Sequence, residues 1–176
     1  CGLVGSNGIG KSSVLESLDC FFNNKQWNHN TIVKKSGFKT TKPHIVPVFL
    51  VNKNDVGIEF RAHAESINSV VNDFAESQAS NASVVRVASS FIQHREQLKR
   101  NINFEKYYLL PIGLDYKSNV SVSIFNSRLL VERFSDGEPD SARSSLDTDE
   151  LNQLIPLLNH LQESIEYIYI PREIDP

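Results

Sequence analysis

The sequence predicts a mixed α/β fold, and three features support that prediction. A glycine-rich loop at residues 5–13 follows a short apolar run and leads into a stretch with helical apolar spacing. Runs rich in β-branched residues, separated by polar turns, indicate antiparallel hairpins at residues 44–62 and 107–134. Near the end, an apolar stripe between residues 147 and 164 predicts a further helix.

Composition bounds the class of protein. The chain has 176 residues, of which 40% are hydrophobic and 22% charged, which suits one domain with its own core. A net charge of −3 argues neither for nor against a nucleic-acid partner. Cys1 and Cys20 are too few for a disulfide framework and match no metal-ligand spacing. No run approaches the ~20 apolar residues of a membrane span, so we expect a cytoplasmic protein without a membrane partner.

The first third of the chain is expected to contain a strand end, a helix and a loop. Residues 1–4 indicate the end of a buried strand. From Ser12 onward the apolar residues recur at helical spacing, at Val14, Leu15, Leu18, Phe21 and Phe22. Residues 23–42 are polar and predict a long loop.

The middle of the chain predicts a hairpin followed by two helices. Residues 44–51 and 56–62 are the two expected strands, joined by a polar turn at residues 52–55. Apolar residues at helical spacing predict helices over residues 64–77 and 84–101. The polar residues 77–83 link the two helices.

The last third predicts a second hairpin, a helix and a strand. Residues 107–116 and 120–134 are the expected strands of this hairpin, and residues 135–145 predict an exposed loop. Asp147 or Thr148 is expected to cap a helix that extends to Ser164. Pro156 lies inside that helix, so we expect a kink or a break there. Residues 166–170 predict a closing strand.

The motif at residues 5–12 predicts a phosphate-binding loop. The sequence Gly5-Ser6-Asn7-Gly8-Ile9-Gly10-Lys11-Ser12 matches G-x-x-x-x-G-K-[ST] at every fixed position. The glycines allow main-chain N–H groups to turn around phosphate oxygens, and the following helix directs its positive end at them. Lys11 is the candidate catalytic residue, placed between the β- and γ-phosphates. Ser12 is the candidate magnesium ligand, and Ser13 is expected to donate to the α- or β-phosphate mainly through its backbone.

The residues inside and after this loop indicate a class. The run from Asn7 to Leu18 resembles the N-G-x-G-K-S-[ST]-[LIV]-[LIV]-E-[AS]-[IL] sequence of SMC, RecF and OLD-type ATPases, which belong to the ABC class. The resemblance implies binding of ATP and Mg²⁺, and association of ATPase heads into a homodimer or higher homo-oligomer when ATP binds. It also implies work on or in response to DNA, in repair, genome maintenance or antiphage defence, with a nuclease or another effector as a possible partner.

The resemblance covers only the first part of such a head. The chain has no L-S-x-G-[EQ] signature and no run of four hydrophobic residues followed by Asp-Glu. We therefore expect residues 1–176 to form a single, incomplete ATPase domain, without its upstream strands and carboxy-terminal lobe. ATP hydrolysis is then expected of the full-length protein and not of this chain alone, because the carboxylate that activates water is missing.

Two other functions are compatible with the loop. A GTPase would use Asn52, Lys53 and Asp55 as an N-K-x-D sequence that reads guanine. Its position so soon after Lys11 argues against this, and a polar turn explains these residues more simply. The other alternative is a scaffold that binds nucleotide without hydrolysing it and serves a partner effector.

Smaller signals have both a functional and an ordinary interpretation. The lysines at positions 34, 35, 39 and 42 are candidates for contact with DNA phosphates, although a solvated basic loop is the commoner explanation. Trp27 could stack on adenine, although a tryptophan that covers the edge of the core is more usual. The histidines are scattered, so no metal other than magnesium is assigned.

Overall fold

The computed structural model describes residues 11–27, 43–75, 82–123, 127–134, 143 and 145–170. Gly5, Ser6, Asn7, Gly8, Ile9 and Gly10 therefore lie outside the described residues. So do the expected strand end at residues 1–4, the lysine-rich part of the first loop, and most of the linker at 77–83 and the loop at 135–145.

The sheet is built around β3 (Tyr107–Asp115), a strand that is buried along most of its length. On one side it pairs antiparallel with β1 (His44–Ile45) and β2 (Val48–Asn52), and on the other side with β4 (Val120–Val122). The β3–β4 hairpin was predicted, and the Asp115 side chain holds its turn by accepting from the backbone N–H of Lys117 at 2.8 Å.

The first expected strand is present but interrupted. Ile45 lies opposite Leu114 and Val48 opposite Pro111, so β1 and β2 share one register along β3. Between them, Pro47 has no N–H to give to the ladder. Near this point Gly113 of β3 lies so close to the backbone of β1 that an added Cβ would be 2.0 Å from the carbonyl oxygen of Ile45.

The predicted strand at residues 56–62, and with it the first hairpin, is wrong. Asn52 accepts from the backbone N–H of Asn54 at 2.9 Å and so caps the 3₁₀ turn η1 (Lys53–Asp55) instead of a hairpin turn. A second 3₁₀ turn, η2 (Ile58–Phe60), leads directly into α2 (Arg61–Asp73). The place beside β2 belongs to β3, which comes from a distant part of the sequence.

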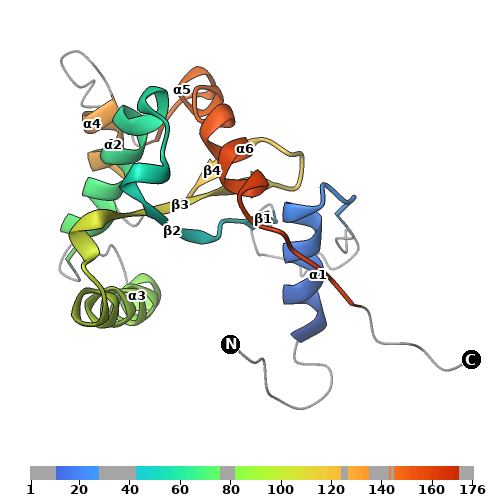
Figure 1. The fold of residues 1–176 in the computed structure, drawn as a ribbon, viewed down its shortest axis with the longest axis horizontal. Coiled ribbons are helices and arrows are strands. Elements are labelled where there is room, and N and C mark those ends of the chain that lie inside the picture. The colour runs from blue at the N-terminus through green and yellow to red at the C-terminus, as the bar shows by residue number, and fades with distance from the viewer. Residues whose placement is uncertain are drawn as a thin grey trace, which may run out of the picture.

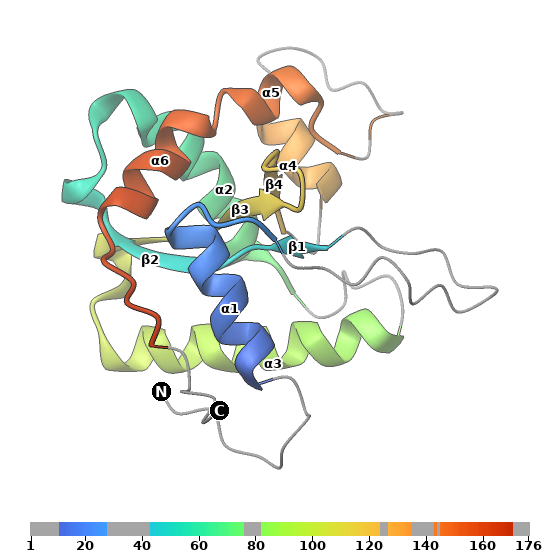
Figure 2. The same ribbon diagram turned by 90° about the vertical axis from the view of Figure 1, so that its right-hand side faces the viewer.

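Helices cover both faces of the sheet (Figures 1 and 2). On one face lie α2, α4 (Ser127–Phe134), α5 (Thr148–Asn152) and α6 (Ile155–Glu163), and on the other lies α3 (Ala82–Asn101). The two helices expected at residues 64–77 and 84–101 are present as α2 and α3, although α2 begins and ends a few residues earlier than expected. The 3₁₀ turn η4 (Phe104–Lys106) connects α3 to β3.

The predicted strand at residues 120–134 is wrong for most of its length, because only β4 at its start is a strand. Residues 127–134 form α4, which buries Leu130 and Val131. Two contacts fasten this helix to α2: Arg133 donates to Asp73 at 2.8 Å, and His63 stacks on Phe134. This packing against α2 favours a helix over the extended conformation that the apolar run alone suggested.

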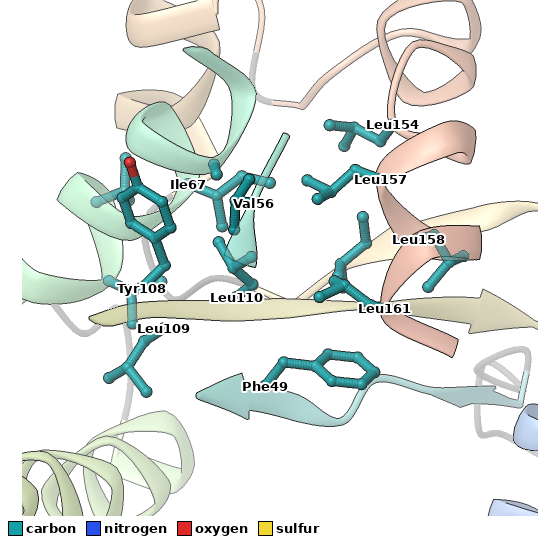
Figure 3. Packing of buried hydrophobic residues seen from close by; sticks show 14 of the residues in the cluster. Phe49, Val56, Ile67, Tyr108, Leu109, Leu110, Leu154, Leu157, Leu158 and Leu161 are labelled. Carbon is teal, nitrogen blue, oxygen red and sulfur yellow. The ribbon is translucent and has the colours of Figure 1, made fainter. Parts of the chain in front are cut away.

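The late helix is broken, as expected. The Asp147 side chain accepts from the backbone N–H of Glu150 at 2.9 Å, and the Glu150 side chain accepts from that of Asp147, so α5 begins with a capping box. The helix ends at Asn152, and α6 begins at Ile155 with Pro156 in its first turn. From α6, Leu157 and Leu161 point towards Leu110 of β3 and Val56 in the centre of the core (Figure 3).

Candidate functional site

The motif lysine and its two serines lie in the first turn of α1 (Lys11–Phe22). A helix leaves its first backbone N–H groups without partners inside the helix, and its dipole makes this end attractive to anions. The helix was expected from Ser12, so the observed start differs by one residue. Ser12 and Ser13 are exposed at this end. The structure thus brings Lys11, Ser12 and Ser13 together in one turn.

Only the carboxy-terminal end of α1 is inserted into the core. Phe21 is completely buried, whereas Val14 and Leu15 are 49% and 39% exposed. The apolar stripe expected along the whole helix is therefore covered only at its end. The turn that carries Lys11 to Ser13 points away from the sheet, towards the lower edge of the molecule in Figures 1 and 2.

The end of α6 and the segment that follows it hold α1 in place. Gln162 Nε2 donates to the Phe21 carbonyl at 2.6 Å, and Asn23 Nδ2 donates to the Tyr167 carbonyl at 3.1 Å. The Tyr167 hydroxyl donates to the Leu15 carbonyl at 3.0 Å, and its ring stacks on Phe22. The expected strand at 166–170 is wrong: these residues form no strand, because they contact a helix and no strand among the described residues pairs with them.

An ion pair closes the turn after α1. Lys25 Nζ donates to Asp19 Oδ2 at 2.7 Å, and Asn23 Nδ2 donates to Asp19 Oδ1 at 2.6 Å. The hydrogen bond from Lys25, followed by that from Asn23, lowers the pKa of Asp19, while the bond to Asp19 raises the pKa of Lys25. Both groups remain charged at neutral pH, so the chain turns back along the helix immediately after α1 ends.

This turn places Trp27 beside the first half of α1. A hollow of about 100 Å³ is lined by Ser13, Glu16, Ser17, Cys20 and Trp27. Cys20 Sγ donates to the Gln26 carbonyl at 3.5 Å and holds the returning chain against the helix. No site role was predicted for Glu16, Ser17 or Cys20 from the sequence. The available signal was their spacing, because positions 13, 16, 17 and 20 lie on one face of a helix.

The N-K-x-D residues make contacts within the fold. Asn52 caps η1, Lys53 Nζ lies 5.0 Å from the centre of the Tyr108 ring, and the Asp55 carbonyl is 3.1 Å from His160 Nε2. The guanine-reading role stays a prediction that none of these contacts tests. Among the residues the structure describes, no group of three His, Cys, Asp or Glu side chains is arranged to hold a metal ion.

The comparison with protein families identifies the class. A family model described as an AAA ATPase domain matches residues 2–174. The chain belongs to the AAA ATPase domain family. This membership implies a P-loop nucleotide-binding fold, which the mixed helices and antiparallel sheet of the structure fit. No curated protein and no solved structure matches the chain.

Membership in the AAA ATPase domain family supports the coarser predictions. A nucleotide-binding ATPase of P-loop type was predicted, and the family confirms that class. The roles of the individual loop residues, the SMC/RecF/OLD group and the partners remain predictions. Within the described part of the chain, no helix is long and apolar enough to cross a membrane.

Proposed function

We propose that this chain binds ATP with Mg²⁺ through residues 5–13 and is the nucleotide-binding part of an ABC-type ATPase of the SMC/RecF/OLD-like group. The observation that carries the proposal is the position of the motif. Its lysine and serines occupy the first turn of a helix whose amino-terminal end is exposed, and the family match covers the entire loop.

The chemistry follows from that turn. The free N–H groups at the start of α1 and the positive end of its dipole bind phosphate oxygens. Lys11 adds a full positive charge and neutralises charge on the β- and γ-phosphates. The Ser12 hydroxyl is a hard oxygen ligand of the type Mg²⁺ prefers, and the remaining magnesium ligands come from phosphate and water. Ser13 binds the α- or β-phosphate through its backbone.

The finer class rests on sequence. The run from Asn7 to Leu18 has the residues expected of SMC, RecF and OLD-type ATPases at the loop and in α1. On this basis the protein acts on or in response to DNA, in repair, genome maintenance or antiphage defence. ATP binding brings two heads together, and a nuclease or effector is the expected partner. The alternative function, a scaffold that holds ATP without hydrolysing it, would bind the nucleotide through the same residues of the loop.

Calorimetry with magnesium tests the binding site. We expect the full-length protein to bind ATP with clear preference over GTP, and the Lys11→Ala variant to lose that binding. Lys117→Ala is a matched control, because Lys117 is an exposed lysine in the turn between β3 and β4. It should bind ATP like the unchanged protein.

Each other outcome has a definite meaning. A preference for GTP would overturn the ABC assignment and favour the guanine-reading role of Asn52, Lys53 and Asp55. Equal ATP binding by the Lys11→Ala and unchanged proteins would place the nucleotide elsewhere. Hydrolysis of bound ATP by the full-length protein would exclude the non-hydrolysing scaffold.

A further inference from the structure

We propose that the hollow beside α1 is the nucleobase site and that the base of the bound nucleotide stacks on Trp27. This inference rests on the proposed function, because it requires phosphates at the first turn of α1. It adds Trp27, and aromatic stacking, at the base end of the nucleotide.

The location supports the proposal. Ser13 belongs both to the phosphate-binding turn and to the lining of the hollow, so the two regions are continuous. From Ser13 the hollow continues along one face of α1 through Glu16 and Ser17 to Cys20, and Trp27 forms its other wall. A nucleotide whose α-phosphate lies at Ser13 can therefore direct its sugar and base along this face.

The wall is held in a defined position. The ion pair of Asp19 with Lys25 closes the turn after α1, and the bond from Cys20 Sγ to the Gln26 carbonyl fixes the residue next to Trp27. Trp27 is half-buried, so part of its ring is left for a ligand. An indole offers a large flat face, and stacking on such a face is favourable for any nucleobase. With a volume of about 100 Å³, the hollow suits a flat ring laid against the indole.

Charge decides which end of the nucleotide lies here. Among the described residues that line the hollow, Glu16 is the charged one, and its negative charge disfavours phosphate. The same carboxylate accepts hydrogen bonds, and the exocyclic amino group of adenine is a donor. Ser17 Oγ donates to the Ser13 carbonyl at 2.6 Å, which leaves its oxygen free to accept. The phosphates therefore lie at the lysine end and the base at the glutamate end.

The decisive experiment separates the base from the phosphates. Binding of Mg·ATP and of Mg·tripolyphosphate, which has the phosphates but no base, is measured by calorimetry on the full-length protein and its Trp27→Ala and Trp27→Phe variants. Trp27→Ala should weaken ATP binding roughly 5- to 150-fold, the range that loss of one stacked base predicts. Tripolyphosphate binding should stay within about twofold, and Trp27→Phe should recover most of the ATP affinity because it keeps an aromatic face.

Three results would overturn the proposal. Unchanged ATP affinity in Trp27→Ala would show that the base lies elsewhere. Equal losses for ATP and tripolyphosphate would show that Trp27 only supports the fold of the loop. Failure of Trp27→Phe to recover affinity would exclude stacking as the source of the effect.

The two proposals fail in different ways. If the loop does not bind phosphates, the unchanged protein binds neither ligand and the Lys11→Ala variant is no worse. If the loop binds phosphates but Trp27 does not bind the base, ATP and tripolyphosphate each bind the Trp27 variants as tightly as they bind the unchanged protein. Trp27 is the only tryptophan in this chain, so its fluorescence gives a second readout. ATP should change the part of the emission that the full-length protein loses in Trp27→Phe, and tripolyphosphate should not.

Discussion

At the scale of single residues, Gly113 allows β3 to lie close to the segment between β1 and β2. A Cβ at this position would lie 2.0 Å from the Ile45 carbonyl oxygen and 2.7 Å from Val46 Cα. Both are backbone atoms, and they can move away only if the hydrogen bonds that pair β1 and β2 with β3 are disturbed. We expect Gly113→Ala to lower the free energy of unfolding by roughly 1–3 kcal/mol, the usual cost of overpacking.

Urea unfolding measures that cost. Ser121→Ala, which lies opposite Gly113 on β4, is a suitable control because it changes the same part of the sheet without adding volume. It should cost clearly less than Gly113→Ala. A Gly113→Ala variant as stable as the unchanged protein would show that β1 can shift away from β3.

The sequence predicted the residues of the phosphate loop but not those of the proposed base site. Lys11 and Ser12 stand in a motif whose spacing is fixed by the turn that it must make, so sequence alone was enough to predict roles for them. Glu16, Ser17 and Cys20 look like ordinary positions of a helix. They form a lining only because the chain turns at Lys25 and returns Trp27 to them, and that turn depends on a contact with Asp19.

At the scale of elements, Arg95 joins the two middle helices. Its side chain is 7% exposed, and Nη1 donates to the carbonyls of Val71 and Phe74 at 2.9 Å each. These carbonyls end α2 and have no further helical turn to bind them. We expect Arg95→Met to lower the free energy of unfolding by roughly 2–4 kcal/mol, because it removes two buried hydrogen bonds from a charged donor.

Arg100→Met provides the matched control, because Arg100 is an exposed arginine of the same helix. Its cost should be below about 0.5 kcal/mol, as for other exposed positions. Both costs are measured by urea unfolding, and similar values for the two variants would contradict the bridging role of Arg95.

Elements with their own periodicity were predictable, and those that depend on distant partners were not. The helices α2 and α3 and the capped, broken pair α5 and α6 follow from apolar spacing, from Asp147 and from Pro156. The segments at 56–62, 120–134 and 166–170 also contain β-branched or aromatic runs. Apolar runs of this length suit a strand or a buried helix or loop, and the distant partner decides between them. Residues 56–62 do not pair with β2, because β3 pairs with it instead.

At the scale of the whole molecule, α1, the helix proposed to bind nucleotide, is attached at one end and exposed at the other. Phe21 and Phe22 hold α1 to the core and to Tyr167, whereas Ser12, Ser13, Val14 and Leu15 are exposed. Contacts from Gln162 and Tyr167 join α1 to the end of α6 and to the segment after it. A ligand at the first turn of α1 therefore lies on a surface that a second molecule can reach, which is the arrangement required for ATP held between two heads.

Self-association should accordingly depend on ATP. A ligand that binds the dimer more tightly than the monomer stabilises the dimer by mass action, and the two subunits should then use the same surface around a twofold axis. We expect sedimentation velocity to show the full-length protein shifting from monomer towards dimer when Mg·ATP is added, with Lys117→Ala behaving identically. Lys11→Ala should stay monomeric at the same ATP concentration. A dimer that forms equally well without ATP, or equally well in Lys11→Ala, would show that association uses a surface unrelated to the nucleotide.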